Sequence, residues 1–416
     1  MRTILKVVFA GVVFLVFSAV ADLTLGVLGF PADIQEQYAH PPRYRETIKN
    51  IEFEYAFETN SQGLRYKEIP LQKPTGTSRV LVLGDSFVEG HGVMREETFS
   101  ALLEQKFVAD GYPVDFMNGG LSGTGPLQQA KLLIHVGSQY HPDGLLVCVF
   151  PNDIADTPET ASPTELDAIP QIQRSGIKSL VYRLWPRTYM LAVQAYRWRY
   201  YLRRTKPSDM VSEVSLRALE VGIPQERIDA WKARLPEDLV TAANKGTFGG
   251  PILSYGLLYP EFWTDGIDID TERAEAKWKS MVALLTEIVH RGRQQGMEVG
   301  VVFIPFGGMY DPAQFDESVR NPGRQAGIHL RREWLTGQSE LQKRLDLWTR
   351  TEGVPFLDLT SAFREAAKEK QPLNYVLDGH WNSAGHHVAA MAIEQWLKTR
   401  NVFTFIPPAK GTLASQ

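Results

Sequence analysis

A run of four apolar residues, Val80 to Leu83, leads directly into Gly84-Asp85-Ser86 and constrains the fold more than any other stretch. A short apolar run that ends at a glycine is typical of a strand buried on both faces of a parallel sheet. Ser86 would then lie at the carboxyl end of the strand, where open α/β sheets bind their ligands. The alternative is structural, because aspartate and serine are also favoured at the N-cap of a helix. This stretch predicts an α/β fold and leaves both roles of Ser86 open.

Four further apolar runs predict strands, and segments of helical periodicity separate most of them. The runs cover residues 114–117, 145–150, 299–304 and 354–359, and apolar residues recur at helical spacing over 99–107, 126–134, 276–289, 341–348 and 384–398. Strands that alternate with helices through short connections form right-handed parallel β/α units. The expected fold class is therefore α/β, a three-layer sandwich with a five-stranded parallel sheet and helices on both faces.

The alternation pauses at about residues 155–270, where no comparable strand run occurs. A connection this long is commonly a lid or a binding element, so we expect a large, mainly helical insertion. Within it, residues 180–206 alternate aromatic side chains with arginines. Trp185 and Trp198, with Trp263 further along, could stack on sugar rings. Alternatively, the aromatic residues pack on the sheet while the arginines stay solvated, or the segment lies on anionic lipid.

The other domain boundaries follow from local composition. Residues 31–77 are interrupted by prolines and are expected to form a linker arm. Within this arm, Ile51 to Glu58 alternates apolar and acidic residues like an edge strand. The main domain is expected to cover residues 78–400, and residues 401–416 are expected to form a C-terminal tail.

The first 30 residues have the composition of a targeting segment. Two basic residues precede an uncharged run over 7–21, and a second apolar run over 23–30 follows Asp22. One interpretation is a secretory signal peptide cleaved after Ala21. The other is an uncleaved transmembrane helix over residues 7–30, which is long enough to span a bilayer with its basic end inside. The second apolar run favours the anchor. In either case we expect the body of the protein outside the cytoplasm, on the periplasmic side, with the membrane as a partner of the N-terminal segment.

The composition excludes several classes of partner and cofactor. A formal net charge of -4 gives no reason to expect nucleic acid. Cys148 is the single cysteine and lies in an apolar run, so neither an intrachain disulfide nor a cysteine metal site is expected. The spacing of histidine, aspartate and glutamate suggests no metal site. We therefore expect no cofactor and no metal.

Three predicted strand ends and one late turn carry polar residues suited to acyl transfer. The strand ends offer Ser86, Gly120 and Asn152, and the turn before the last helix adds Asp378 and His380. Carboxyl ends of parallel strands meet at one edge of the sheet, so these residues can converge. His380 can act as the base for the Ser86 hydroxyl, and Asp378 can orient the imidazole. An oxyanion hole could use the N–H groups of Ser86 and Gly120 with the Asn152 side chain.

Each of these residues also has a purely structural interpretation. Gly120 could simply permit a tight turn, Asn152 could cap a helix, and Asp378 could shape the loop before the last helix. His91 competes with His380 as the base because it is close to Ser86 in sequence, but its only nearby acid is Glu89. The joint occurrence of the polar residues at successive strand ends favours the catalytic interpretation.

Four short blocks of the chain resemble the conserved blocks of the SGNH (GDSL-type) hydrolase superfamily. They are Gly84-Asp85-Ser86-Phe87, Asn118-Gly119-Gly120-Leu121-Ser122-Gly123, Asn152-Asp153 and Asp378-Gly379-His380-Trp381-Asn382. Residues 60–77 also resemble the lead-in of membrane-anchored bacterial members. The resemblance implies a flavodoxin-like sheet of order 2-1-3-4-5 and ester hydrolysis through an acyl-serine. It also implies Ser86 as nucleophile, Gly120 and Asn152 as oxyanion donors, and His380 as base with Asp378 behind it.

Two positions depart from the pattern of that superfamily. Many members carry the acid three residues before the histidine, where this chain has Leu377, and the residue before Asn152 is Pro151 rather than glycine.

The expected function is a serine esterase acting on O-acyl groups of envelope saccharides or lipids, with a small acyl ester or an acylated saccharide as substrate. The alternatives are an O-acetyltransferase on a cell-surface polysaccharide and a non-catalytic envelope scaffold.

Overall fold

A computed structural model describes residues 2–28, 38–166, 177–193, 195, 209–248, 250–320 and 328–405. The chain divides into two compact units, which are described separately. The smaller unit comprises Met1–Gln37 and Ala168–Ser208, and the larger one comprises Tyr38–Asp167 and Asp209–Gln416. The middle of the expected insertion therefore belongs to the same unit as the N-terminal segment.

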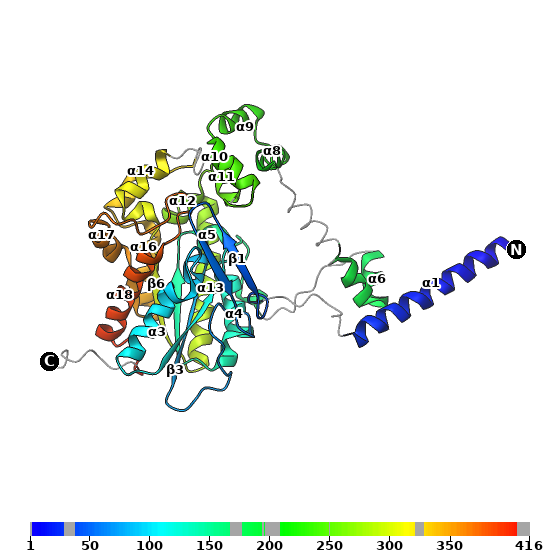
Figure 1. Cartoon of the computed structure of the whole chain (residues 1–416), viewed down its shortest axis with the longest axis horizontal. Coiled ribbons are helices and arrows are strands. Elements are labelled where there is room, and N and C mark those ends of the chain that lie inside the picture. Colours follow the sequence, from blue (N-terminus) through cyan, green and yellow to red (C-terminus); the bar gives the residue numbers. More distant parts are fainter. Residues whose placement is uncertain are drawn as a thin grey trace. The chain divides into compact units, whose positions relative to one another are not determined.

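The smaller unit contains helices α1 (Arg2–Val27) and α6 (Ile177–Leu184), both labelled in Figure 1. The buried Asp22 accepts a hydrogen bond from the Thr188 N–H at 2.8 Å and lies 3.6 Å from the Arg187 guanidinium. Among the described residues, no helix is both long and apolar enough to cross a membrane. The expected transmembrane helix over residues 7–30 is therefore not supported. Trp198 and the rest of 196–206 lie outside the described residues.

The core of the larger unit is a parallel sheet of five strands. They are β3 (Ser78–Gly84), β4 (Val114–Gly120), β5 (Gly144–Val149), β6 (Glu298–Phe303) and β7 (Phe356–Asp358). Their order is β4-β3-β5-β6-β7, and every adjacent pair is parallel. The expected α/β class and the order 2-1-3-4-5 are confirmed. Val80 to Leu83 are fully buried, as a strand covered on both faces requires.

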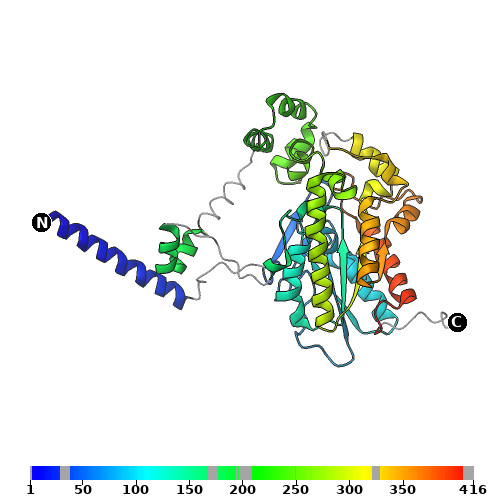
Figure 2. The ribbon, with the colours of Figure 1, turned by 180° about the vertical axis from the view of Figure 1, so that it is seen from behind.

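Helices cover both faces of this sheet. On one face, α3 (Phe99–Ala109) packs against α18 (Ser383–Arg400), which in turn contacts α17 (Thr360–Ala367). On the other face, α4 (Pro126–His135) packs against α13 (Glu272–Gln294). Figure 1 shows the first layer in front of the sheet, and Figure 2 shows α13 from the opposite side. Helix α16 (Glu340–Glu352) leads into β7 and contacts it.

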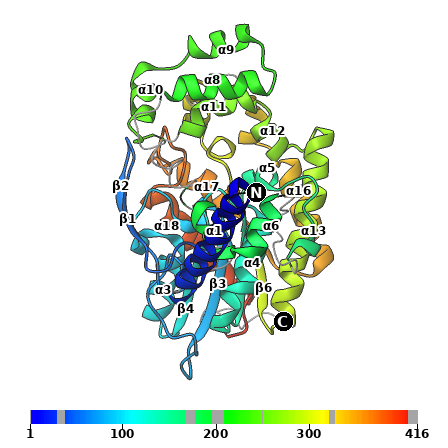
Figure 3. The same ribbon diagram turned by 90° about the vertical axis from the view of Figure 1, so that its right-hand side faces the viewer.

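The connection between β5 and β6 supplies most of the extra helices. In the larger unit these are α5 (Asn152–Asp156), α8 (Met210–Glu220), α9 (Gln225–Lys232), α10 (Glu237–Asn244), α11 (Gly250–Leu258) and α12 (Phe262–Ile267). Figure 3 shows α8 to α11 gathered at the end of the sheet where α5 begins. Trp231 lies in a small core that α8, α9 and α11 share. The expected helical insertion is thus observed at the carboxyl edge of the strands.

From Tyr38 onward, the expected linker arm is part of the larger unit. Strands β1 (Arg45–Lys49) and β2 (Glu54–Glu58) pair antiparallel as a hairpin. Alternate residues of β2 are buried, and Phe53, Tyr55 and Phe57 form a small cluster. The alternating pattern predicted this strand correctly, but it gave no sign that the hairpin contacts the site described below.

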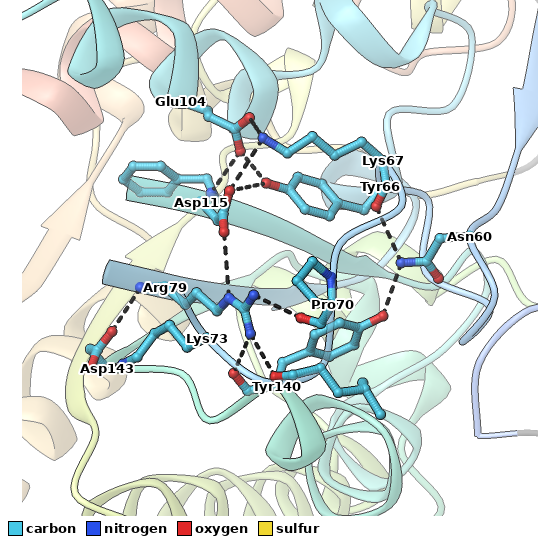
Figure 4. Close-up of polar contacts among 12 residues, drawn as sticks. Asn60, Tyr66, Lys67, Pro70, Lys73, Arg79, Glu104, Asp115, Tyr140 and Asp143 are labelled. Atoms are coloured by element: carbon cyan, nitrogen blue, oxygen red, sulfur yellow. Dashed lines mark hydrogen bonds and ion pairs between the residues drawn. The ribbon is translucent and has the colours of Figure 1, made fainter. Parts of the chain in front are cut away.

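A buried arginine, Arg79, binds the segment before β3 at the amino end of the sheet (Figure 4). The Arg79 side chain is fully buried and donates to the carbonyl oxygens of Pro70, Leu71 and Tyr140 at 2.8–2.9 Å. Its Nε lies 3.4 Å from Asp115 Oδ2. A buried guanidinium needs such partners, because an unpaired charge in the interior is strongly destabilising.

Candidate active site

Ser86 stands at the junction of β3 and the short helix α2 (Ser86–Glu89). The Asp85 side chain caps this helix, since its Oδ1 accepts the Phe87 N–H at 3.0 Å. The structural and the chemical interpretations of the motif therefore apply to different residues. Asp85 is the cap, and Ser86 presents its hydroxyl to a cavity.

Ser86, His380 and Asp378 form one hydrogen-bonded chain. The Ser86 Oγ lies 2.7 Å from His380 Nε2, and His380 Nδ1 lies 2.5 Å from Asp378 Oδ1. Burial alone would raise the pKa of Asp378, but the adjacent His380 and His91 rings outweigh it and hold this pKa well below its ordinary value. Asp378 is thus an anion positioned to orient and stabilise a protonated His380. The two-residue spacing, with Leu377 at the other position, is compatible with this contact.

Gly120 is not placed as the sequence predicted. Its N–H donates to Asn118 Oδ1 at 2.9 Å and is therefore not available to a ligand. A Cβ atom at this position would lie 2.0 Å from the Glu89 backbone nitrogen, so the glycine is required by the close approach of β4 to α2. The expected role of Gly120 as an oxyanion donor is wrong on this geometry, and its role is packing.

Gly123, three residues further along the same block, lines the cavity instead. It has φ +67°, which favours glycine, and no atom lies within 4 Å of the position a Cβ would take. Its N–H and that of Ser86 have no acceptor within the described part of the chain. Asn152, the third expected donor, also lines the cavity. The block contains three glycines, and its sequence alone does not show that Gly123, after Ser122, is the one at the cavity.

Glu89 holds the loop that carries Gly123. Its buried carboxylate accepts the Ser122 N–H at 3.0 Å and also the Ser122 hydroxyl, and it pairs with His40 at 2.7 Å. The Arg65 guanidinium donates to the carbonyl oxygens of Glu89 and Gly90 at 2.7 and 2.6 Å. Residues of the expected linker arm therefore support both α2 and the Ser122-Gly123 turn.

The tip of the β1–β2 hairpin binds the loop that carries the acid and the base. The Glu52 carboxylate accepts the backbone N–H groups of Val376, Leu377 and Asp378 at 2.8, 2.9 and 2.7 Å. The Asn50 side-chain amide donates to Asp378 Oδ2 at 3.3 Å. Sequence reasoning missed both residues, because more than 320 positions separate them from their partners and no local pattern announces the contact.

His91 contacts Asp378 but not the nucleophile. Its Nε2 lies 3.7 Å from Asp378 Oδ2, and its Nδ1 lies 3.3 Å from the Tyr55 hydroxyl. Its backbone N–H donates to the Ser86 carbonyl oxygen at 3.0 Å, but within the described residues no hydrogen bond joins its ring to the Ser86 hydroxyl, so the geometry favours His380 as the base. His91, Asp378 and His380 each offer a ligand atom within 4.8 Å of the others, and they could hold a metal ion. Sequence spacing could not show this group, because tertiary contacts assemble it.

Two buried carboxyl groups lie beneath the nucleophile. Burial raises the pKa of Asp85 to about 7, and burial together with the nearby Asp85 raises that of Asp153 well above its ordinary value. Asp153 accepts the Phe150 N–H at 2.8 Å and the Gln129 amide at 3.1 Å. These acids are fixed as parts of the scaffold under Ser86.

The cavity beside Ser86 has a volume of about 250 Å³. The nucleophile and His380 stand at its wall, and aromatic side chains such as Phe150, Trp263 and Phe306 line much of the rest. Among the tryptophans expected to bind sugar, Trp263 lines this cavity, whereas Trp185 belongs to the smaller unit.

Comparison with known proteins returns only distant structural likeness. No family model matches the chain, and no curated protein matches it. Among solved structures, a lipase/acylhydrolase from Enterococcus faecalis is 12% identical, with 78% of this chain and 96% of that chain covered and a TM-score of 0.35. An acetylxylan esterase from Geobacillus stearothermophilus is 14% identical, with 80% of this chain and 97% of that chain covered and a TM-score of 0.35. An esterase from Pseudoalteromonas sp. is 12% identical, with 77% of this chain and 98% of that chain covered and a TM-score of 0.33.

Proposed function

We propose that this chain is a serine esterase of the SGNH type that hydrolyses O-acyl esters through an acyl-Ser86 intermediate. The observation that carries the proposal is the continuous contact from Ser86 through His380 to Asp378 at the carboxyl edge of the sheet. The four sequence blocks that resemble the SGNH superfamily support it.

In the proposed reaction, the Ser86 oxygen attacks the acyl carbonyl carbon while His380 Nε2 takes the hydroxyl proton. The oxyanion is stabilised by the N–H groups of Ser86 and Gly123 and by the Asn152 amide, each worth about 2.7–4 kcal/mol in the transition state. Collapse of the intermediate breaks the bond to the alcohol oxygen, which takes the proton from His380. Water activated by the same imidazole then releases the acid from Ser86.

The test uses a small aryl ester and a covalent probe. The purified chain should hydrolyse para-nitrophenyl acetate and react once with a fluorophosphonate, and Ser86→Ala should lose both properties. Ser78→Ala, at the opposite end of β3, is the matched control and should retain both. Hydrolysis that persists in Ser86→Ala would rule out this nucleophile.

We also propose that the protein acts outside the cytoplasm. The support is the sequence of residues 1–30, in which basic residues precede an apolar run. Cell fractionation tests it, and recovery of the whole active protein in the cytoplasm would contradict it.

A further inference from the structure

The cavity beside Ser86 contains an acidic side chain that the proposed reaction does not use. Asp156 is the last residue of α5, one helical turn after Asn152, and both line the cavity. Within the described residues, the Asp156 carboxyl group forms no hydrogen bond and no ion pair. Burial raises its pKa to about 6, while the charge of Lys277 opposes this shift. A partly buried carboxylate without a partner is unfavourable, so a ligand that brings hydrogen-bond donors would stabilise it.

A second acceptor, on a side chain that lines the same cavity, also lacks a donor. The Asn152 Oδ1 atom is buried and has no hydrogen-bond partner within the part of the chain that is described. Buried polar atoms in folded proteins are nearly all satisfied, so an unsatisfied one beside a cavity points to a bound group. Two neighbouring acceptors on one face of α5 match a ligand with more than one donor.

The rest of this part of the cavity is an aromatic wall. Trp263 stacks on Phe306 at 4.1 Å between ring centroids, and Phe150 and Phe262 meet its ring edge-on. Tyr255 in turn stacks on Phe262 at 4.7 Å. Trp263 and Tyr255 remain partly exposed and line the cavity. The wall therefore offers apolar ring surface next to two acceptors.

We infer that the alcohol portion of the substrate is a saccharide, whose ring hydroxyls donate hydrogen bonds to Asp156 while its C–H face packs against Trp263. This inference rests on the proposed esterase function and narrows its substrate class from saccharides or lipids to saccharides. A sugar ring supplies both several donors and an apolar face. An alkyl alcohol or a fully acylated lipid has no hydroxyl donor and would cover the Asp156 carboxylate with methylene groups, which leaves both acceptors unpaired and is costly.

A substrate that carries a quaternary ammonium group is the main competitor, because carboxylates and aromatic rings also bind such cations. The geometry disfavours it for two reasons. The rings form a continuous wall in which one face of Trp263 and one face of Tyr255 are already covered, rather than a cage. A quaternary ammonium has no N–H, so it would leave Asn152 Oδ1 without a donor.

The experiment compares an O-acetylated methyl glycoside, para-nitrophenyl acetate and acetylcholine as substrates of the full chain. We expect the wild type to have a higher kcat/KM for the sugar ester than for acetylcholine. In Asp156→Asn, the ratio of kcat/KM for the sugar ester to that for the aryl ester should fall at least about tenfold, because the amide lacks the negative charge and replaces one of the two acceptor oxygens with an NH2 group. Glu159→Gln is the control, since Glu159 is exposed and pairs with Arg273 on the surface, and this ratio should not change.

The outcomes separate this inference from the proposed function. If the wild type hydrolyses no ester and Ser86 is not labelled, the esterase proposal fails. If the wild type hydrolyses the aryl ester but prefers acetylcholine, or if Asp156→Asn leaves the ratio unchanged, the esterase stands and the saccharide inference is overturned. A measurement on the wild type alone avoids any folding defect of the variant. The free methyl glycoside should inhibit aryl ester hydrolysis competitively, and an absence of inhibition would contradict the inference.

Discussion

Removing the Glu52 carboxylate should slow the proposed reaction without removing any group that touches the substrate. Glu52 accepts three successive N–H groups of the loop that ends at Asp378, and Asp378 in turn orients His380. A hydrogen bond to a charged acceptor contributes about 1.5–3 kcal/mol. Glu52 is partly exposed, so water can replace some of the lost hydrogen bonds, and we expect Glu52→Ala to destabilise the protein by about 2 kcal/mol in total.

The catalytic effect follows from the position of the loop. A displacement of about 1 Å in a catalytic group can lower a rate by about 100-fold, so we expect kcat to fall roughly 10- to 100-fold. KM should change little, because Glu52 does not line the cavity. The assay is steady-state hydrolysis of para-nitrophenyl acetate, with thermal unfolding measured in parallel to show that the variant is folded at the assay temperature.

Glu54→Ala is the matched control for this prediction. Glu54 lies two residues away in β2, is exposed and pairs with Lys49 on the surface at 2.8 Å. An exposed ion pair contributes little, so kcat should stay within about twofold of the wild type. If Glu52→Ala retains the wild-type kcat, the hairpin does not position the acid. If Glu54→Ala loses as much activity as Glu52→Ala, the effect belongs to the hairpin fold and not to the three hydrogen bonds.

Two further predictions concern Asp85 and the glycines of the Asn118 to Gly123 block. The pKa of Asp85 is about 7 in the folded protein against 3.8 for an ordinary aspartate, so the folded state binds more protons than the unfolded state between these values and loses stability as the pH rises through them. Asp85→Asn removes this loss. The difference in Tm between the variant and the wild type should therefore be several degrees more favourable to the variant at pH 8 than at pH 5. An equal difference at both pH values would refute the raised pKa of Asp85. Gly120→Ala should lower stability by more than about 2 kcal/mol in urea unfolding, because its Cβ would meet the Glu89 backbone. Gly123→Ala has open space and should cost only about 1–2 kcal/mol of left-handed strain, so equal losses for the two variants would contradict the assignment.

Short-range patterns predicted the sheet and four of the residues that line the cavity, namely Ser86, Asn152, Asp378 and His380. Apolar runs such as Val80 to Leu83 identify buried strands without any knowledge of their neighbours, because burial on both faces demands an uninterrupted run. The convergence of Ser86 with His380 follows from one further rule, that parallel strands end at the same edge. In the Asn118 to Gly123 block, the sequence predicted Gly120 as the donor instead of Gly123, three residues later. The motif does not show that the Gly120 N–H already donates to Asn118.

The sequence by itself therefore indicated the α/β class through local periodicity. It indicated the strand order and the residues of the proposed triad through short polar motifs that resemble those of a known superfamily. Only the tertiary structure decided which glycine faces the cavity and that Glu52 and Asn50 bind the loop of the acid. It also showed that, among the described residues, the Asp156 carboxyl group has no partner beside the aromatic wall. These contacts join segments that are distant in sequence or depend on which acceptors their neighbours have already used. No periodicity records such pairings, because their geometry exists only once the chain has folded.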